Sequence, residues 1–581
     1  MKELVSQQAF AKAVHLEKFG FAVRALMNIS KINALNELYS SAVHNDGIAF
    51  IDSIFEQLEL SYQYNEKELE RIPKTGPFIC VANHPLGAID GLLMLYLISK
   101  VRPDFKVMAN FLLKEIEPLS DHFIAVNPFE DNISKNSSVA GMKSALKHLE
   151  AGSGLGIFPA GEVSSFQPSQ IRVTDKTWRS SALKLIRNAD VPVIPMHFKG
   201  KNSLLFQLLG FIHPNLRTAA LPSELLNKKK EDVKVRIGKA ISSESQKKWK
   251  NYNHFGRYLR ARVYAMDTDI ELRHFVRRRP SFNRLIGINT IAKKQATELL
   301  QNEIDSIHDL NILNQANFSV YLAPARRIPF LLKEIGRLRE LTFREVGEGS
   351  NKSSDLDNFD RHYEHLLLWD WEKQKIVGSY RLGEGKTIMK KTGKKGFYIH
   401  SLFKIKPQFN PILNKSIELG RSFIVREYQQ KRLPLFLLWK GIVHKLNSDD
   451  SYQYLIGPVS ISNQYCSLSQ LIIVEFIKKY HYNYDLAKYI KPRKKFKVRF
   501  KKEESTELLD SAQNDLRKVD DILIDIEPTH IPVPILIKKY IKQNAKIIGF
   551  NVDPKFNYTL DGLMLLNVED LPENSLNSLS K

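Results

Sequence analysis

The 581-residue sequence contains little cysteine. Its two cysteines, Cys80 and Cys466, lie far apart, and neither belongs to a Cys-x-x-Cys pair. This scarcity argues against a disulfide framework and against a zinc site built mainly on thiolates, and it fits a reducing compartment.

The sequence also lacks long apolar segments. No window reaches the roughly 18 uninterrupted apolar residues of a membrane-spanning helix. The first thirty residues have no apolar core of the kind found in signal peptides. The longest candidates, Gly91–Ser99 and Leu204–Ile212, are short enough to be core helices or interfacial segments. We therefore expect a protein that is neither secreted nor integral to a membrane.

The chain has fewer acidic than basic residues. The chain has 86 Lys and Arg against 63 Asp and Glu, which gives a net charge of +23 at pH 7. Such an excess predicts an anionic partner, whether nucleic acid, an acidic protein or a negatively charged membrane. Hydrophobic residues make up 43% and charged residues 26% of the chain, which is ordinary for a globular protein and excludes a mostly disordered chain or a coiled-coil rod.

The first half of the chain alternates strand-like and helix-like segments. After a helical start at 1–75, the pattern predicts an α/β layered domain that ends near residue 265. The expected strands are 77–82, 105–109, 123–126, 155–159 and 191–197, and the expected helices are 92–99, 137–151 and 178–188.

The second half predicts a second α/β domain over residues 291–566. A linker at 266–290 should precede it and a loose tail at 567–581 should follow it. The expected helices are 328–343, 439–446 and 467–480, and the expected strands are 365–370, 376–382, 416–424 and 454–459. The fold class is therefore α/β with two domains.

The strongest local signal is Asn83-His84-Pro85-Leu86-Gly87-Ala88-Ile89-Asp90. His84 leaves a strand at a turn, and Asp90 arrives on the next helical turn. Asp90 can hydrogen-bond one ring nitrogen of His84 and leave the other to accept a proton from an alcohol. This is the His–Asp half of a triad in which a substrate hydroxyl replaces the serine. The alternative is a turn-to-helix junction with Asp90 near the helix N-terminus.

Later segments favour the chemical interpretation. Residues 156–162, Gly-Ile-Phe-Pro-Ala-Gly-Glu, place a glycine-rich turn after a strand, where backbone N–H groups can face a phosphate or an oxyanion. Trp178-Arg179 opens the next helix, and Val191–Pro195 is a buried strand closed by proline. In this order, over about residues 60–240, these segments resemble the glycerophospholipid acyltransferase family. Their residues are most similar to those of its haemolysin-like branch.

The resemblance implies that His84 is a general base and Asp90 its orienting partner. It implies substrate contacts at Asn83, Phe158, Pro159, Gly161, Glu162 and Arg179, with Ser164 and Arg172 as further candidate polar contacts. Two departures from the family pattern stand out. Five residues, not four, separate His84 from Asp90, and Ala160 occupies the usual glutamate position.

The informative residues of the second half are dispersed, and each alone reads as a solvated charge or an ordinary salt bridge. They are Asp355, Asp357, Asp360, Arg381, Glu418 and Arg421. As a set, over about residues 320–565, they resemble the N-acyltransferase fold group that contains acyl-homoserine-lactone synthases and ornithine-lipid N-acyltransferases. The resemblance implies a GNAT-like mixed α/β domain.

The chemistry of these residues suits an amino-acid substrate. Clustered carboxylates can bind its ammonium group and accept a proton, and Arg381 or Arg421 can hold its carboxylate bidentately. No coenzyme A pyrophosphate loop is evident, which favours an acyl-carrier-protein thioester over acyl-CoA as the acyl donor. No resident cofactor and no metal are expected. His365 and Asp370 repeat the motif spacing, but on a strand their side chains point to opposite faces.

The segment Lys491–Lys502 holds eight Lys or Arg residues in twelve positions. Charged and apolar residues alternate through 495–501, which predicts a strand with one cationic face. The function of this face stays open between an edge strand protected by lysine and a docking surface.

The sequence as a whole favours a bifunctional acyltransferase. The resemblance implies that residues 291–566 N-acylate an amino acid and that residues 1–265 then esterify the hydroxyl of the lyso-lipid. Ornithine lipid, or a related glycine or serine lipid, is the implied product. The expected partners are acyl carrier protein and an anionic membrane surface, at the cytoplasmic face of the inner membrane; nucleic acid is not expected. The alternatives are a glycerophospholipid acyltransferase with a regulatory C-terminal domain and a basic nucleic-acid or membrane-binding adaptor.

Overall fold

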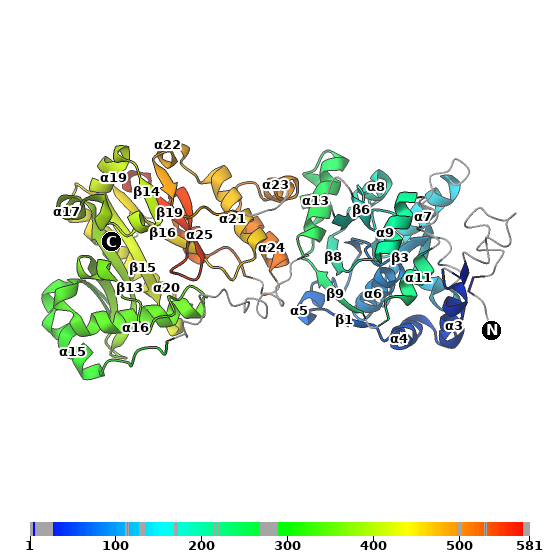
Figure 1. Cartoon of the computed structure of the whole chain (residues 1–581), viewed down its shortest axis with the longest axis horizontal. Helices are drawn as coiled ribbons and strands as arrows, with labels where there is room; N and C mark the ends of the chain where they lie inside the picture. The colour runs from blue at the N-terminus through cyan, green and yellow to red at the C-terminus, as the bar shows by residue number, and fades with distance from the viewer. Residues whose placement is uncertain are drawn as a thin grey trace. The chain divides into compact units, whose positions relative to one another are not determined.

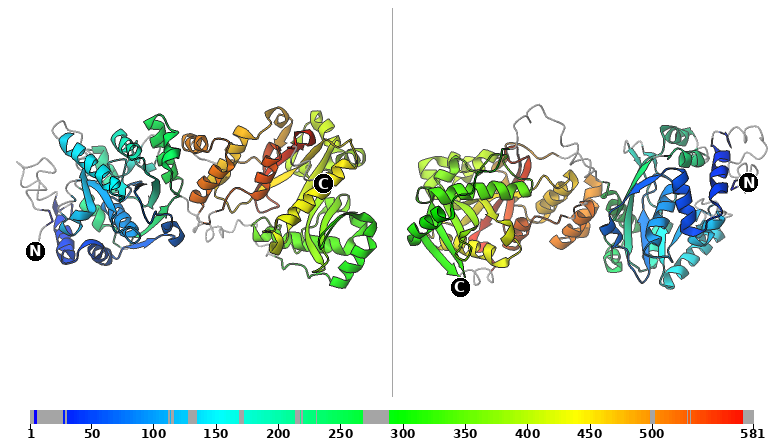
Figure 2. Two further views of the ribbon diagram at one scale, coloured as in Figure 1. Left: turned by 180° about the vertical axis from the view of Figure 1, so that it is seen from behind. Right: turned by 90° about the horizontal axis from the view of Figure 1, so that it is seen from below.

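The computed structural model divides into two units, which are described separately (Figures 1 and 2). The first comprises Met1–Thr268 with Lys501–Ser511, and the second comprises Asp269–Phe500 with Ala512–Lys581. The structure describes residues 4–5, 27–28, 30–110, 113, 116–126, 135–167, 172–212, 217, 220–229, 231–267, 289–497, 502–527, 529 and 531–572. Most of the expected linker and tail, and residues 498–501 of the basic segment, lie outside these ranges.

A seven-stranded sheet forms the centre of the N-terminal unit, in the order β1-β9-β8-β2-β5-β3-β4. Neighbouring strands are parallel, except that β8 and β9 are antiparallel. The strands are β1 (Ser61–Gln63), β2 (Phe78–Ala82), β3 (Lys106–Asn110), β4 (Phe123–Val126), β5 (Gly154–Ile157), β8 (Val193–Lys199) and β9 (Asp232–Ile237), and β6 (Ser165–Gln167) and β7 (Arg172–Thr174) form a separate hairpin.

Helices cover both faces of this sheet (Figure 1). Residues of α3, α4 and α6 pack on one face, and residues of α7, α8 and α13 pack on the other. Side chains alternate along a strand, so Cys80 joins the first core and Ile79 the second. Burial on both sides explains why β2 is a continuous apolar run. The helices are α3 (Ile32–Ala42), α4 (Gly47–Gln57), α5 (Glu66–Leu69), α6 (Ala88–Ser99), α7 (Lys135–Glu150), α8 (Ser180–Asn188), α9 (Leu204–Ile212), α11 (Leu221–Leu226), α12 (Ser243–Lys247), α13 (Tyr252–Tyr264) and α23 (Lys502–Ala512).

The second unit contains an eight-stranded sheet in the order β10-β11-β12-β13-β15-β16-β19-β18. Its strands are β10 (Asn311–Gln315), β11 (Phe318–Pro324), β12 (Glu364–Asp370), β13 (Lys375–Glu384), β15 (Ser416–Ile424), β16 (Tyr454–Ile461), β18 (Lys546–Asp553) and β19 (Thr559–Asn567), and β14 (Phe403–Ile405) pairs apart from it with β17 (Ile490–Pro492). The helices are α15 (Thr297–Ser306), α16 (Pro329–Glu345), α17 (Gly385–Lys391), α18 (Ile399–Leu402), α19 (Asn410–Asn414), α20 (Arg432–Asn447), α21 (Ser467–Tyr480), α22 (Tyr484–Ala487), α24 (Leu516–Ile526) and α25 (Ile535–Lys542).

Two irregularities in this sheet determine where its functional residues lie. The parallel strands β15 and β16 pair only from Ser416–Glu418 to Tyr454–Ile456, and beyond that point their ladder ends. In addition, the register between β13 and β15 shifts between Ser379 and Arg381, and Arg421, in the opposing part of β15, adopts a positive φ of 52°. This bulge changes the side-chain alternation of β15.

The α/β class with two domains is confirmed, and the strand at 123–126 and the helix at 467–480 have the expected bounds. Two local expectations are wrong. Residues 61–63 form the edge strand β1 and not a helix, because they pair with β9. Residues 495–497 form no strand. Just before them, the N–H of Lys494 donates to the side chain of Asn551, and its C=O accepts the N–H of Val552. Among the described residues, no helix is both long enough and apolar enough to cross a membrane.

Candidate active sites

The first candidate site lies at the carboxyl end of β2, near the middle of the N-terminal sheet. His84 follows β2, and Phe158 follows the neighbouring strand β5. The two rings stack with their centroids 4.2 Å apart. Ligand sites of α/β sheets lie at the carboxyl ends of the strands, so His84 occupies a position that is typical of an active site.

His84 and Asp90 form the hydrogen bond that the sequence predicts. His84 Nδ1 lies 3.0 Å from Asp90 Oδ2; the imidazole is 19% exposed and the carboxylate is fully buried. The same carboxylate oxygen accepts the backbone N–H groups of Leu86 (2.8 Å) and Gly87 (3.1 Å). Burial raises the pKa of Asp90, and the bonds from His84 and from these N–H groups oppose the rise. Because Nδ1 is engaged, Nε2 is the nitrogen left to accept a proton.

Asp175, which the sequence interpretation does not include, fixes the backbone around His84. Its Oδ1 accepts the backbone N–H of His84 (3.2 Å) and the hydroxyl of Ser164 (2.5 Å), and its Oδ2 accepts the indole N–H of Trp178 (3.1 Å). Ser164 in turn donates its N–H to the carbonyl of His84 (2.8 Å). This buried carboxylate therefore joins the histidine turn to the segment that follows the glycine-rich turn.

The glycine-rich turn is held by charged side chains. Gly161 has a φ of +68°, which strains any other residue, and a Cβ there would lie 2.6 Å from Arg179 Nε and displace that side chain. Glu162 pairs with Lys176 (2.9 Å) and Arg217 (2.5 Å). Burial opposes ionisation of Glu162, but these two cations lower its pKa. The Glu162 carboxylate is therefore ionised and occupied by protein cations.

Three other expected contact residues take scaffold roles in the structure. The Asn83 amide bonds the C=O and the N–H of Phe198, both at 2.8 Å, and so joins the ends of β2 and β8. The carbonyl of Pro159 accepts the N–H of Arg179 (2.9 Å). Arg172 lies over the ring of Tyr264, with Cζ 5.8 Å from its centroid.

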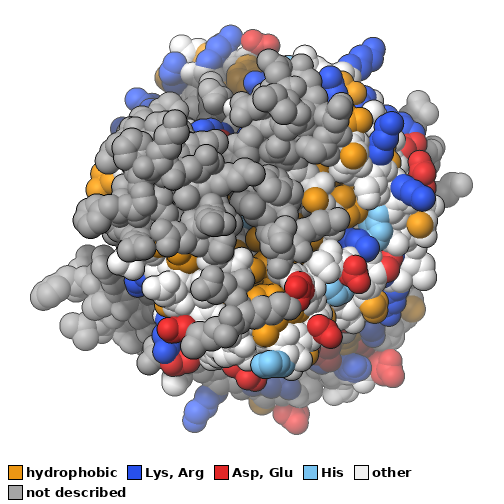
Figure 3. Space-filling view, turned by 90° about the vertical axis from the view of Figure 1, so that its right-hand side faces the viewer, with side chains coloured by type: hydrophobic (Ala, Val, Ile, Leu, Met, Phe, Trp, Pro, Cys, Tyr) orange, Lys and Arg blue, Asp and Glu red, His pale blue; other side chains and the backbone are white. Residues whose placement is uncertain are grey.

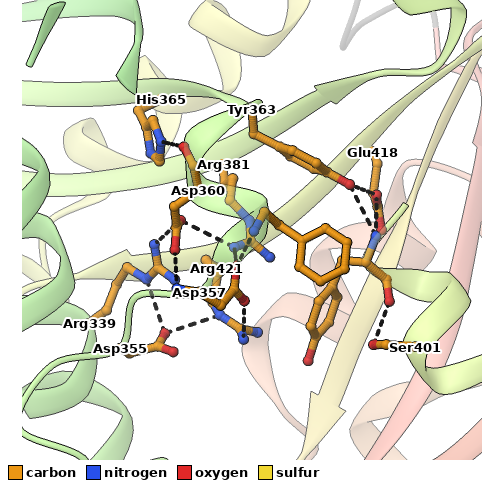
Figure 4. Close-up of polar contacts among 12 residues, drawn as sticks. Arg339, Asp355, Asp357, Asp360, Tyr363, His365, Arg381, Ser401, Glu418 and Arg421 are labelled. Atoms are coloured by element: carbon orange, nitrogen blue, oxygen red, sulfur yellow. Dashed lines mark hydrogen bonds and ion pairs between the residues drawn. The ribbon is translucent and has the colours of Figure 1, made fainter. Parts of the chain in front are cut away.

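The second candidate site contains a closed ring of alternating arginines and aspartates (Figure 4). Arg339, from α16, contacts Asp355 (3.1 Å) and Asp360 (2.8 Å). Arg381, from β13, contacts Asp357 (2.7 Å) and Asp360 (3.2 Å). Arg421, at the bulge of β15, contacts Asp355 (3.1 Å) and Asp357 (3.2 Å). Each aspartate therefore bridges two arginines, and the opposite charges balance.

Electrostatics explains why this buried ring is ionised. Burial opposes ionisation of Asp360, but Arg339 and Arg381 hold the pKa of its carboxyl well below the usual range. The arginines act in the same direction on the pKa of Asp355. The sequence interpretation treats the three aspartates as an open cluster for a cationic substrate; in the structure, protein arginines already occupy them.

Glu418 connects this region to the α18 segment. Its carboxylate accepts the hydroxyl of Tyr363 and the backbone N–H groups of Tyr398 (3.0 Å) and Ile399 (2.8 Å). Figure 4 shows Glu418 pointing to this turn and away from the ring. Glu418 therefore positions Tyr398, whose hydroxyl donates to Asp553 (3.2 Å).

A cavity of about 980 Å³ opens in the second unit where β15 and β16 part. Its wall includes Arg421 from the ring and the carboxyl-bearing residues Glu348, Asp553 and Asp561. Helices α20 and α25 supply an apolar wall, which includes Phe436, Trp439, Leu536 and Tyr540. A cavity with one polar and one apolar side suits an amphiphilic ligand.

Comparison with known proteins identifies both units. Residues 3–272 match the family model described as acyltransferase, and residues 338–439 match the model described as acetyltransferase (GNAT) domain. The chain joins an acyltransferase domain to a GNAT domain. It is therefore an enzyme that transfers acyl groups, which sets aside the non-enzymatic adaptor.

Curated relatives match about half of this acyltransferase each. A glycine N(alpha)-acyltransferase of Bacteroides thetaiotaomicron is 27% identical over 49% of this chain and 87% of its own length. A lyso-glycine lipid O-acyltransferase of Phocaeicola vulgatus is 26% identical over 42% of this chain and 88% of its own length. Among solved structures, the 1-acyl-sn-glycerophosphate acyltransferase of Thermotoga maritima is 17% identical, covers 47% of this chain and 93% of its own, and has a TM-score of 0.24.

The sequence interpretation missed some residues of the acyltransferase and only partly identified others. Nothing in the sequence places Asp553 and Asp561 in one cavity with Glu348. The signal for Asp175 was weak as well, since a single aspartate before Trp178 is common. In the described part of the chain, no group of three or more His, Cys, Asp or Glu is arranged to hold a metal ion.

Proposed function

We propose that this acyltransferase makes an acylated glycine lipid in two steps, with one domain for each step. The GNAT domain N-acylates glycine, and the N-terminal domain then O-acylates the hydroxyl of the lyso-lipid. The observation that carries the proposal is the combination, on one chain, of the His84–Asp90 pair and the GNAT cavity beside Arg421. The names of the two relatives, one for each step, support this choice of substrates.

In the first step, the amine of glycine attacks the carbonyl carbon of an acyl thioester. A C–N bond forms, the C–S bond breaks, and the thiol leaves. The apolar wall of the cavity, with Phe436, Trp439 and Tyr540, suits the acyl chain. The polar end, with Arg421 and Tyr398, suits the amino acid.

In the second step, His84 Nε2 takes the proton of the lyso-lipid hydroxyl as its oxygen attacks a second thioester. An ester bond forms, and the thiolate leaving group takes the proton. Asp90 holds the ring orientation through Nδ1 and stabilises the imidazolium that forms. We assign Asp175 and Ser164 the role of fixing the histidine backbone.

We further propose that acyl carrier protein delivers the acyl groups. Such a carrier is acidic, and the net charge of +23 favours its encounter with this chain. Described basic residues gather after α22, at Lys488, Lys491, Arg493, Lys494, Lys495 and Lys497.

We also propose that the N-terminal domain works on an anionic membrane surface, at the cytoplasmic face of the inner membrane. On α9, Leu204, Leu205 and Leu208 are 82%, 60% and 59% exposed. Their helix lies beside the site, because Phe206 packs against Val163, directly after Glu162. Figure 3 shows one face of the N-terminal unit, on which described hydrophobic side chains reach the surface beside charged ones. Such a face suits insertion at a lipid headgroup boundary.

The test is acyl transfer by the purified full chain. Given acyl-carrier-protein thioester and glycine, the proposal predicts N-acylglycine and then its O-acylated product. Given glycine lyso-lipid directly, the wild type should form only the O-acyl ester. Transfer to lysophosphatidic acid in preference to both acceptors would contradict the proposal and favour a glycerophospholipid acyltransferase.

A further inference from the structure

We propose that Asp561 accepts the ammonium proton of the amino-acid substrate, in an anionic subsite that it forms with Asp553 and Glu348. The proposal deepens the proposed function and rests on it, because it assigns the proton acceptor of the N-acylation step. None of these three residues belongs to the Arg–Asp ring.

Strand register places two of the carboxylates on one face of the sheet. Asp561 of β19 lies opposite Asn551 of β18 and opposite Ser460 of β16. Asp553 follows Asn551 by two residues, so its side chain points to the same face. Both aspartates line the cavity, and they are 3% (Asp553) and 5% (Asp561) exposed. The cavity therefore receives two nearly buried carboxylates from adjacent strands.

Glu348 completes the subsite from the segment after α16. It lines the same cavity, and its charge acts on Asp561 together with that of Asp553. Among the described residues, no hydrogen bond or ion pair of the Glu348 carboxylate is found. Burial alone raises its pKa to about 7. A half-buried carboxylate that faces a cavity without a protein partner is suited to a cationic ligand.

The cations around the subsite do not neutralise it. Arg421 is the cation whose charge most affects Asp561, but it already pairs with Asp355 and Asp357 in the ring. The neutral partners are the hydroxyl of Ser460, which donates to Asp561 (3.1 Å), and that of Tyr398, which donates to Asp553. The other cationic side chains of the cavity wall are Lys431, Arg432 and Lys539.

The proton affinity of the subsite suits a base. Burial and the neighbouring charges of Asp553 and Glu348 raise the pKa of Asp561 well above its ordinary value. A carboxylate that binds a proton readily is a better acceptor at neutral pH than an ordinary one. The arrangement also suits a zwitterion, because Arg421 borders the same cavity as the three carboxylates.

The ammonium group gives one proton to Asp561, and the freed nitrogen lone pair attacks the thioester carbonyl carbon. As the C–N bond forms and the C–S bond breaks, the thiolate takes that proton from Asp561. The second proton lost by the nitrogen goes to solvent, which leaves a neutral amide and a thiol.

The experiment compares two acceptors in the full chain, glycine and aminooxyacetate. Aminooxyacetate is a weakly basic amine that is already neutral at pH 7, so its attack needs no prior deprotonation. Asp561→Asn should lower kcat for glycine by about 100-fold and kcat for aminooxyacetate by less than tenfold. The pH–rate profile for glycine should lose its acidic limb. Glu348→Gln, in a loop, should raise KM for glycine about tenfold with a small change in kcat.

Asp370→Asn is the matched control. Asp370 is a 2%-exposed aspartate of the same domain, bonded to Tyr428 and outside the cavity, and its variant should retain both activities. Two results would overturn the proposed subsite without overturning the proposed function. In one, Asp561→Asn acylates glycine within threefold of the wild-type rate; in the other, it loses activity equally toward glycine and aminooxyacetate. If Asp561→Asn does not fold, an unchanged KM in Glu348→Gln overturns it. A wild type that acylates no amino acid would overturn the proposed function as well, and lyso-lipid O-acylation reports separately on the other domain.

Discussion

Arg381 Nη1 lies 3.2 Å from Asp360 Oδ1 inside the GNAT domain, where the two residues are 1% and 2% exposed. Asp360 also contacts Arg339 at 2.8 Å, so its removal leaves two buried guanidinium groups short of a partner. We predict that Asp360→Asn lowers the free energy of unfolding by about 3–5 kcal/mol, as expected for breaking a buried ion pair. Urea unfolding followed by tryptophan fluorescence measures this change.

The control for this prediction is an exposed pair of the same type in the same domain. Arg327 lies 2.8 Å from Asp309, and their side chains are 41% and 60% exposed. Solvent screens such a pair, so Asp309→Asn should unfold at the same urea concentration as wild type. Equal destabilisation by the two variants would contradict the role of burial in the ring.

The buried carboxyl group of Glu348 should make the stability of the protein depend on pH. Burial raises its pKa from 4.5 to about 7, so between these values the folded protein binds more protons than the unfolded chain. The free energy of unfolding therefore falls as pH rises through this window. Glu348→Gln should reduce the loss of stability between pH 5 and pH 8, measured by urea unfolding at each pH. Glu345→Gln, an exposed position on α16, should retain the wild-type slope.

A substitution at Gly87 should impair O-acylation and leave N-acylation intact. Its φ is +79°, and its N–H donates to Asp90 at 3.1 Å. Gly87→Ala strains the backbone by about 1–3 kcal/mol and should reduce lyso-lipid O-acylation at least tenfold while N-acylation continues. Gly76→Ala is the matched control, since Gly76 has a φ of +77° and its Cβ would have no atom within 4 Å. That variant should keep its O-acylation rate, and a loss equal to that of Gly87→Ala would contradict the prediction.

The exposed leucines of α9 predict membrane binding. Replacing Leu204, Leu205 and Leu208 together with asparagine should weaken binding to vesicles of anionic phospholipid more than tenfold, because each leucine contributes about 1.5–3 kcal/mol on burial. Vesicle flotation measures the bound fraction. Leu299→Asn, at a leucine that is 40% exposed in the other unit, should bind as wild type does. Unchanged flotation of the triple variant would show that another surface is responsible.

The sequence predicts the local elements of the N-terminal site well because they are contiguous. The run Phe78–Ala82 and the turn that follows it contain both the strand signal and the His84–Asp90 pair, and the hydrogen bond forms despite the extra residue. Asn83 was harder to interpret, because its partner is the backbone of Phe198, which is 115 residues away. A contact of that range leaves no local pattern.

The second site depends even more on tertiary structure. The sequence interpretation groups Asp355, Asp357, Asp360, Arg381 and Arg421, and the structure brings all of them together. Their pairing depends on Arg339 and on the bulge at Arg421. Residue spacing in the sequence predicts neither of these features. The cavity arises where β15 and β16 part, and its carboxylates come from β18, from β19 and from the distant segment after α16, which only the folded sheet brings together.

The most direct test of the two-step account is the lipid profile of a bacterial host that makes no aminolipids and expresses this chain. Mass spectrometry should find the O-acylated glycine lipid with the wild type and accumulated N-acylglycine lyso-lipid with His84→Gln. Wild-type levels of the O-acylated product in the His84→Gln strain would contradict the assignment of His84 as the base of the second step.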